Sequence, residues 1–408
     1  MSLPSAASTD LLVAMFAPDP LRHAARQLAR DDAATRSFPQ LLARKLARMS
    51  ASPLAYLRGA APLYYELLVE HPELGEGPSG EGWLIGDAHL ENFGAFRTAD
   101  ASGTESVVFD VNDFDEAVIG PFRWDVVRLL TSVILGSREL GSDGRQSVQL
   151  CAAILDGYAP ALCEGTLPVD APAPVRRLLA KVATRTHKDL LDRRTERVGN
   201  ARRFVRGERY EELAAELIPK ARIAFERYVQ ALDPDQHTAR DHFEVLDLAF
   251  RIAGTGSLGG LRIAVLTCGK GDVDSRWVFD MKAEGTPSAS VLLGIPTQSP
   301  AERVLSAACA CLENPPRMAG TTELDGQPMF VRRLLPQEDK LDLMHLRVEE
   351  LPDLARYLGA RLGAAHRRGV QKAPTSRWEK ADLSGLTERA IVVAGLHEAA
   401  YLALCRTL

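Results

Sequence analysis

Apolar residues between Phe38 and Leu68 recur at the spacing of an α-helix. They fall three or four positions apart, as expected for a helix with one buried face. Pro53 lies within this run, and a proline removes a helical hydrogen bond, so we expect two helices separated there. Further helices are expected over Asp125–Leu135, Pro300–Leu312 and Leu351–His366.

Short apolar runs of a different kind predict strands. Trp83–Ile85 ends at a Gly-Asp pair and Val107–Phe109 ends at a cluster of acids, with a polar turn from Thr98 to Glu105 before the second run. Two strands separated by such a turn are typical of a hairpin. A second strand-rich block runs from Phe250 to Val291, and a further strand is expected over Met329–Leu334.

Composition narrows the class of protein. The 408 residues suggest two or three lobes, and the six scattered cysteines form no CxxC pair, which favours reduced thiols and a cytoplasmic location. No segment approaches the ~18 uninterrupted apolar residues of a membrane helix. The net charge of −5 disfavours a general nucleic-acid binder. One segment, Arg176–Arg209, holds twelve Lys/Arg against four Asp/Glu, and either contacts phosphate groups or forms a solvated helix face.

Two polar clusters each follow a short predicted strand. Asp87, His89 and Asn92 lie in the first, and Asp113 and Asp115 lie in the second. Mg²⁺ takes hard oxygen ligands and completes its shell with water and substrate phosphates. Asp87 can accept the proton of an attacking hydroxyl, while Asn92, Asp113 and Asp115 can hold the metal ion. The alternative is that these residues form ordinary turns, in which His89 serves only to brace the loop.

A glycine-rich segment, Gly254–Gly260, is followed by an apolar run from Leu261 to Leu266. A dinucleotide fingerprint would be followed by a long helix, so a loop between two strands is favoured instead. The amides of such a loop can contact nucleotide phosphates, and a lysine on the next strand can pair with them. Plain turn glycines and an exposed lysine are the alternatives. The candidate nucleotide contacts here are Gly254, Gly256, Ser257, Gly259 and Lys282.

These residues resemble known motifs. Ile85–Asn92 resembles the HGDxHxxN catalytic loop of aminoglycoside phosphotransferases and related kinases, and Asp113–Ala117 resembles their metal-binding IDxxDA element. Over roughly residues 36–370, the chain is also similar to the bacterial domain of unknown function 2252 family. The segments that carry this second resemblance are Arg48–Ala60, Gly86–Ala117, Gly254–Gly260 and Phe330–Leu334.

The kinase resemblance implies a role for each matching residue. Asp87 would be the catalytic base or would orient the acceptor hydroxyl, and Asn92 and Asp113 would bind magnesium. Lys282 would pair with the nucleotide phosphates beneath the glycine loop. Asp125, in the following helix, would brace the catalytic loop.

The sequence departs from the kinase pattern in two residues and in its order. Ile85 replaces the histidine that commonly precedes the Gly-Asp pair. Ser306 stands where the acidic partner of Lys282 is expected, which leaves Glu302, one turn earlier, as a substitute. The catalytic loop precedes the glycine loop, whereas in kinases it follows. We therefore infer a circular permutation, which is tolerated where ancestral termini lie close together.

The expected fold is α+β and two-lobed, resembling a permuted protein kinase with a small antiparallel sheet lobe and a large helical lobe. The expected function is ATP- and Mg²⁺-dependent transfer to a hydroxyl of an unidentified small molecule or protein, with phosphoryl and nucleotidyl transfer both open. Neither nucleic acid nor membrane is an expected partner, and the oligomeric state is open. The expected segments are an N-terminal helical segment (1–80), a catalytic part (81–249), a sheet lobe (250–340) and C-terminal helices (341–408).

Two other functions remain open. A degraded kinase-like module would bind a nucleotide or a partner without transfer, and Ser306 favours it. A metallophosphoesterase would explain the GDxH pattern at Gly86–His89, but the later GDxxD and GNH elements that a two-metal site needs are missing from the sequence.

Overall fold

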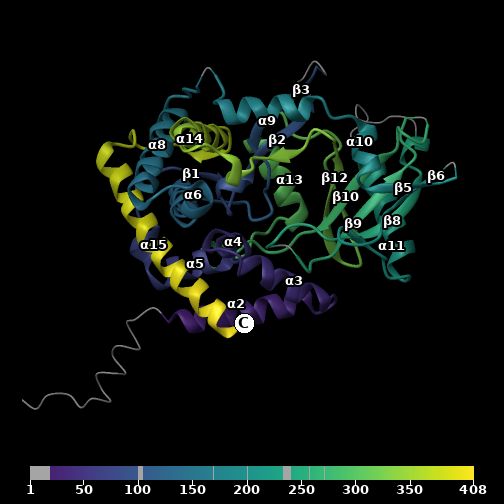
Figure 1. Ribbon diagram of the computed structural model, residues 1–408, viewed down its shortest axis with the longest axis horizontal. Helices are drawn as coiled ribbons and strands as arrows, with labels where there is room; N and C mark the ends of the chain where they lie inside the picture. Colours follow the sequence, from purple (N-terminus) through teal and green to yellow (C-terminus); the bar gives the residue numbers. More distant parts are fainter. Residues whose placement is uncertain are drawn as a thin grey trace, which may run out of the picture.

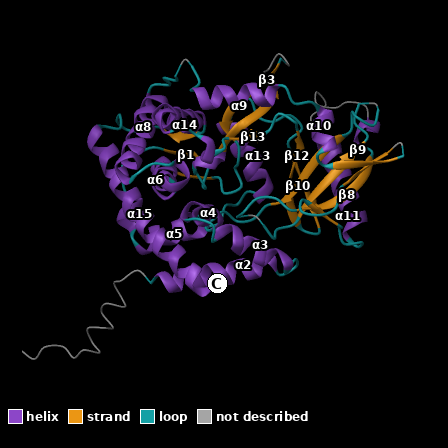
Figure 2. Cartoon of the chain, in the orientation of Figure 1, coloured by secondary structure: helices purple, strands orange, loops and turns teal. Residues whose placement is uncertain are grey.

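The computed structural model describes residues 19–99, 104–168, 170–199, 201–232, 240–256, 258–270 and 272–408. The fold is mixed α+β: one antiparallel sheet lies beside a larger, mainly helical part (Figures 1 and 2). The α+β class is therefore confirmed.

The helical part draws on both ends of the chain. The long helices α8 and α14 pack along each other, and α15 packs along α6 and α2, so the C-terminus lies beside the N-terminal helices (Figure 1). The helices of this part are α2 (Pro20–Thr35), α3 (Gln40–Met49), α4 (Pro53–Gly59), α5 (Ala61–Glu70), α6 (Phe122–Leu135), α7 (Ser137–Leu140), α8 (Gly144–Cys163), α9 (Ala173–Ala183), α14 (Leu351–Arg368) and α15 (Lys380–Thr407).

The sheet has six antiparallel strands in the order β11-β12-β10-β9-β8-β7. Both expected strands of the glycine hairpin form, as β9 and β10, but the sheet also recruits β7 and β8, which begin before residue 250. Its strands are β7 (Tyr210–Glu211), β8 (Val245–Arg251), β9 (Arg262–Thr267), β10 (Trp277–Ala283), β11 (Gly320–Leu324) and β12 (Gln327–Leu334). The nearby helices are α10 (His187–Asp192), α11 (Leu217–Ala231), α12 (Ser290–Leu293) and α13 (Pro300–Cys311).

Alternation along β10 separates the two faces of this sheet. Phe279 and Met281 are buried in an apolar cluster with residues of α11. Asp280 and Lys282 therefore point to the opposite face, toward the helical part. The register places Lys282 between Arg262 of β9 and Phe330 of β12, so Lys282 has one charged and one aromatic neighbour on that face.

Three smaller sheets complete the fold. Their orders are β14-β1-β4, β13-β2-β3 and β5-β6, built from β1 (Glu81–Leu84), β2 (Phe93–Ala99), β3 (Glu105–Val111), β4 (Val118–Pro121), β5 (Thr195–Val198), β6 (Ala201–Phe204), β13 (Asp339–Lys340) and β14 (Val370–Lys372).

The predicted pairing of the 83–85 and 107–109 strands is wrong. β3 pairs with β2, and β1 pairs with β4 and β14. Because β2 carries glycine and alanines, which have weak strand preference, the apolar pattern did not reveal it.

The predicted helix break at Pro53 is confirmed, since α3 ends at Met49 and α4 begins at Pro53. A second break separates α4 from α5, so the segment forms three helices rather than two. Ser52 caps α4 by accepting a hydrogen bond from the amide of Ala55 at 3.1 Å.

Helix α15 is long and apolar enough to cross a membrane by length and composition alone. A core helix passes the same test, and here Leu386, Ala390 and Val393 of α15 are buried in the main apolar cluster with residues of α6. The helix therefore closes the core of the helical part along part of its surface.

Candidate functional site

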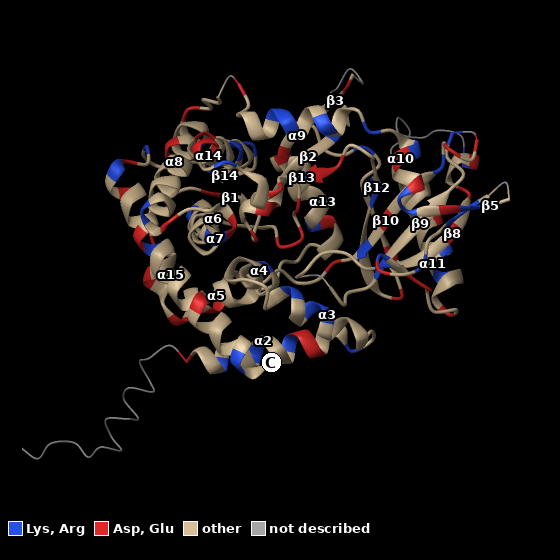
Figure 3. Ribbon diagram, in the orientation of Figure 1, with Lys and Arg blue, Asp and Glu red and all other residues tan. Residues whose placement is uncertain are grey.

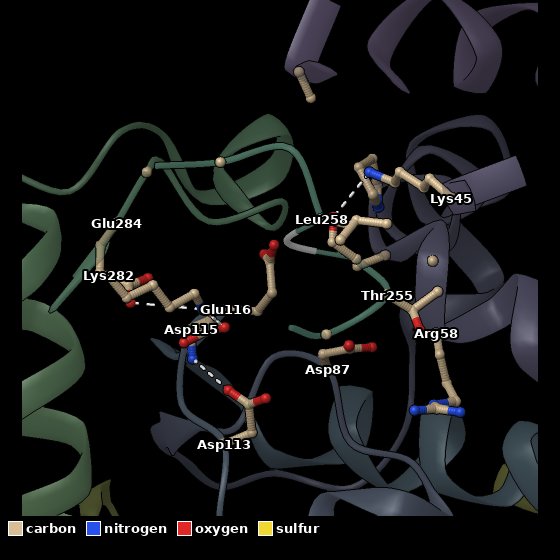
Figure 4. A pocket seen from close by; sticks show the side chains of 18 of the residues that line it. Lys45, Arg58, Asp87, Asp113, Asp115, Glu116, Thr255, Leu258, Lys282 and Glu284 are labelled. Carbon is tan, nitrogen blue, oxygen red and sulfur yellow. Dashed lines mark hydrogen bonds and ion pairs between the residues drawn. The ribbon is translucent and has the colours of Figure 1, made fainter. Parts of the chain in front are cut away.

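A cavity of about 360 Å³ lies where the sheet meets the helical part. Lys282 and Glu284 enter it from one side, Asp87 and Arg58 lie on the other, and Asp113 and Asp115 lie between them (Figure 4). Segments that are far apart in the sequence thus line one space. The predicted site residues among its lining are Asp87, His89, Asn92, Asp113, Asp115, Gly254, Gly256 and Lys282.

Asp87 follows β1 on a tight turn. Gly86 has a φ of 80°, and a Cβ there would stand 1.9 Å from the carbonyl oxygen of Glu116, so only glycine fits. Asp87 Oδ1 accepts hydrogen bonds from Arg128 Nε at 2.9 Å and from Nη2 of the same guanidinium. Arg128 is fully buried in α6 and also donates to the carbonyl of Leu57 at 3.0 Å. One carboxylate oxygen is therefore fixed, and Oδ2 is left for other contacts.

Burial raises the pKa of Asp87 to about 6, although Arg128 opposes this rise. His89 is buried beside it, with Nε2 at 3.7 Å from Asp87 Oδ2, and its Nδ1 accepts a hydrogen bond from the amide of Glu91 at 3.1 Å. Burial also lowers the pKa of His89 well below its usual value, with Arg58 adding to this effect. At neutral pH, Asp87 is therefore mainly ionised and His89 is neutral.

Asp125 lies under the loop that carries Asp87. Its fully buried carboxylate accepts from the amide of Ile85 at 2.5 Å and from the amide of Gly86 at 3.0 Å. His366 of α14 contacts the same carboxylate through Nε2 at 3.0 Å. The position expected to brace the loop therefore contacts it directly.

Asn92 and Asp113 present oxygen atoms to the same cavity. Asn92 is buried, and its Nδ2 donates to the carbonyl of Asp87 at 2.6 Å, which orients the amide group. Asp113 Oδ1 accepts from the amide of Asp115 at 3.4 Å. Within the described ranges, no group of three His, Cys, Asp or Glu residues is arranged to hold a metal ion. A cation at this position would need further oxygen ligands from a substrate.

Lys282 meets two carboxylates. It forms an ion pair with Asp115, and its Nζ lies 3.6 Å from Glu284 Oε1. Burial raises the pKa of Glu284 to about 7, against the lowering effect of Lys282. The acidic partners of the lysine thus come from the loop that carries Asp113 and from the residue that follows β10.

The expected partner, Glu302, is not among these groups, so that prediction is wrong. Glu302 is exposed in the first turn of α13 and does not line the cavity, and Ser306 accepts a hydrogen bond from Gln298 Nε2 at 2.8 Å. The next residue, Arg303, is buried and donates to the carbonyls of Ala117, Asp115 and Gly285. Successive side chains of an α-helix point about 100° apart. A prediction that is wrong by one position therefore selects a side chain that points in another direction, as happened with Glu302 and Arg303.

The glycine loop is attached to the N-terminal helices. Lys45 Nζ of α3 donates to the carbonyl of Gly256 at 2.8 Å, and Arg48 donates to the carbonyl of Gly254. Gly259 has a φ of 105°, and a Cβ there would stand 2.7 Å from Cγ2 of Thr35, so it packs against α2 rather than facing the cavity. Ser257 lies outside the described residues.

Several contributors were not anticipated from the sequence. Arg128 lies one helical turn after Asp125, so it falls on the same helix face. Glu284 lies two residues after Lys282, just beyond the end of β10, so the alternation of strand side chains indicates the same side. Lys45 and Arg303 act on main-chain carbonyls of distant segments, which leave no side-chain pattern in the sequence.

Comparison with known proteins adds a family assignment. No curated protein and no solved structure matches the chain. The family model described as "Uncharacterized protein conserved in bacteria (DUF2252)" matches residues 36–167 and 162–405, which together make up most of the chain. The chain therefore belongs to the bacterial DUF2252 family.

Proposed function

We propose that this protein is an ATP- and Mg²⁺-dependent phosphotransferase of the protein-kinase-like class that acts on a hydroxyl group. One observation carries the proposal. Asp87, Asn92 and Asp113 line a single cavity with Lys282 and the glycine loop, although the two groups are far apart in the sequence. Phosphoryl transfer depends mainly on positioning and charge neutralisation, and this set of side chains can supply both.

Asp87 would accept the proton of the acceptor hydroxyl, or orient that hydroxyl for attack. Because Arg128 occupies Oδ1, the hydroxyl would meet Oδ2, on the side of His89. A pKa of about 6 leaves the carboxylate mainly ionised at neutral pH while keeping it basic enough to accept a proton.

The residues present fit a magnesium ion that is shared with substrate phosphates. Asn92 and Asp113 are hard oxygen donors on the same cavity, and Mg²⁺ usually takes only one or two protein ligands at such sites. When bound, the ion would neutralise charge on the phosphates. Lys282 would contribute a second positive charge, since it lines the same cavity, where its ammonium group lies beside Asp115 and Glu284.

The proposal includes a circularly permuted, two-lobed kinase-like fold. Its support is the junction between α14 and β1. The carbonyl of Gly369, directly after α14, accepts a hydrogen bond from the amide of Trp83 at 3.0 Å, and β14 pairs with β1. A helix near the end of the chain thus stops beside the strand that leads to Asp87. Joining these two points would restore the kinase order of helix, catalytic loop and metal-binding loop.

A second candidate is a module that binds nucleotide without transfer. It is favoured by α13, which directs Arg303 rather than an acid toward the site. Phosphoryl transfer remains the better proposal, because Asp115 and Glu284 already supply acidic partners for Lys282.

The test is ATP turnover with magnesium, comparing the wild type with Asp87→Asn. We expect Asp87→Asn to lower turnover by about 10²–10⁴-fold, the usual contribution of a general base, while thermal stabilisation by ATP is retained. Asp156→Asn, on the exposed face of α8, is the matched control and should turn over ATP at the wild-type rate.

Two results would contradict transfer. Stabilisation by ATP with no turnover in the wild type would indicate the binding module. Hydrolysis of a generic phosphate ester without ATP would indicate a phosphoesterase.

A further inference from the structure

A second cavity, of about 370 Å³, lies on the same face of the sheet and shares Asp113, Asp115 and Lys282 with the first. Apolar side chains such as Phe96 and Phe330 line one part of it. Charged residues on strands line the rest of the cavity. Figure 3 shows basic and acidic segments near each other where the sheet meets the helical part. The charged residues of the six-stranded sheet that line it are Arg251, Arg262, Asp280, Lys282, Arg332 and Arg333.

The strand carboxylate in this cavity is outnumbered by guanidinium groups. Asp280 is 2% exposed and lies 2.5 Å from Arg251 Nη1, and Arg262 Nε donates to it at 2.9 Å. Although burial alone would raise it, these two guanidinium groups hold the pKa of Asp280 well below its usual range. Arg332 has its own carboxylate, Glu338, at 3.2 Å. Asp280 is therefore one negative charge between two positive ones.

Arg194 adds a further positive charge to this cavity. Its Nη1 donates to the hydroxyl of Tyr210 at 3.1 Å, and among the described residues no carboxylate forms an ion pair with it. Tyr210 itself pairs with Arg251 in the sheet, which brings the two arginines together. Arg194 is therefore a positively charged neighbour of Arg251, which shares Asp280 with Arg262. The other carboxylates that line the cavity are Asp113, Asp115, Glu338 and Asp339.

Arg194 also belongs to the basic segment noted in the sequence. Other members of that segment are paired: Arg185 with Asp339, Arg197 with Asp274, and Arg202 with both Asp192 and Asp274. Much of the positive charge of the segment is therefore paired, mostly with carboxylates from other parts of the chain. Arg194 is the member that lines the cavity.

We propose that this second cavity is a phosphate site in which Arg194, Arg251 and Arg262 bind a phosphate group of a ligand. Like charges held close together in a partly buried space are costly unless an anion compensates them, and the planar guanidinium fork matches phosphate oxygens. The inference extends the proposed function, because the phosphate belongs either to the nucleotide or to a second, phosphorylated ligand. The cavity recognises this group through charge, where an apolar pocket would recognise a nucleotide base by stacking.

The experiment measures the affinity of the full-length protein for inorganic pyrophosphate by calorimetry, without magnesium. We expect Arg194→Met to weaken binding at least tenfold and Arg194→Lys to weaken it less. Arg203→Met removes the same charge from an exposed position in the same segment and should change affinity less than twofold. Equal effects of Arg194→Met and Arg203→Met would overturn the proposal. Thermal unfolding of each variant checks that it is folded.

Competition identifies the source of the phosphate. If AMP displaces pyrophosphate and adenosine does not, the nucleotide supplies the phosphate group. If pyrophosphate binds alongside ATP, another phosphorylated ligand supplies it. Displacement by adenosine that is insensitive to Arg194→Met would mean a base pocket and would overturn the site.

The two proposals can fail separately. Asp87→Asn should lower ATP turnover as stated above and leave pyrophosphate affinity unchanged, because Asp87 does not line the second cavity. Arg194-dependent pyrophosphate binding in a protein that never turns over ATP would sink the transfer proposal alone.

Discussion

The two walls of the first cavity are held in place by different means. The carboxylate wall, residues 85–92 and 112–117, is anchored by Asp125 and Arg128, two fully buried side chains of α6. The glycine wall, residues 254–256, 258–262 and 282–284, is attached through Lys45 and Arg48 of α3, which donate to main-chain carbonyls. The carboxylate wall is thus held by buried side chains of the core, whereas the glycine wall is hydrogen-bonded to a helix at the N-terminal end of the described chain.

This difference follows the chemistry that each wall would perform. Charge-assisted hydrogen bonds in a buried setting are strong and hold a carboxylate in one direction, as a proton acceptor requires. Lys282 instead has two carboxylate partners, Asp115 and Glu284, so the loss of one contact leaves it the other. We therefore expect substitutions in the carboxylate wall to affect stability most, and substitutions in the glycine wall to affect ligand contacts most.

The largest expected effect tests the carboxylate wall. Asp125→Ala should lower the free energy of unfolding by about 3–5 kcal/mol, because it leaves the buried amides of Ile85 and Gly86 and the ring of His366 without their shared acceptor. Urea denaturation followed by circular dichroism measures the change. The exposed carboxylate Asp156 provides the control, and Asp156→Ala should stay within about 0.5 kcal/mol of wild type. A small loss for Asp125→Ala would show that both walls are held equally weakly.

A substitution in the glycine wall should lower ATP turnover strongly and the free energy of unfolding only slightly. Lys282→Met should lower ATP turnover by about 100-fold or more, the scale of a lost charge contact in a transition state. It should change the free energy of unfolding by only about 1 kcal/mol, because Glu284, with a pKa of about 7, is already half protonated at neutral pH and can become neutral. Parallel turnover and urea measurements check both values. A stability loss as large as that of Asp125→Ala would break the distinction between the walls.

The carboxylate wall was predictable because its candidates are close together in the sequence. The spacing of Asp87 and Asn92 reflects one short loop, and Asp125 follows at the start of a helix that the apolar pattern also revealed. The β2 strand between the two loops was missed, since its glycine and alanines carry little strand preference.

The glycine wall was predictable only in part. The loop and Lys282 were found from the hairpin pattern, but the helix phase of α13 was misjudged, so Glu302 was chosen where Arg303 faces inward. The attachment of the loop to α3 could not be foreseen, because Lys45 contacts a main-chain carbonyl in a distant segment. Contacts of this kind depend on how the chain folds back on itself.

A smaller effect concerns pH. If Asp87 acts as the base, kcat/KM should fall about tenfold per unit as the pH drops below about 6, because the protonated carboxyl cannot accept a proton. The raised pKa has the opposite effect on stability: the folded state holds this proton more tightly than the unfolded chain, so Asp87 itself favours the folded state as the pH falls from 6 toward 4. Turnover profiles beside circular dichroism at each pH separate the two effects. Asp87→Asn should show no such acidic limb, and a limb that persists in this variant would assign the titration to another group.

The smallest expected effect tests whether the hydrogen bond between α3 and the glycine wall contributes to nucleotide binding. Arg48→Ala removes one donor to the carbonyl of Gly254 and should cost less than about 1 kcal/mol of stability, since the arginine is only half-buried. A loosened loop loses part of its preorganisation for phosphate, so KM for ATP should rise a few-fold while kcat changes little. Arg44→Ala is the matched control, because Arg44 lies one turn earlier in α3 and donates at 3.1 Å to the carbonyl of Glu208, away from the loop. Equal KM values for the two variants would mean that α3 positions the loop by packing alone, and that the hydrogen bond to Gly254 adds nothing to how the glycine wall meets its ligand.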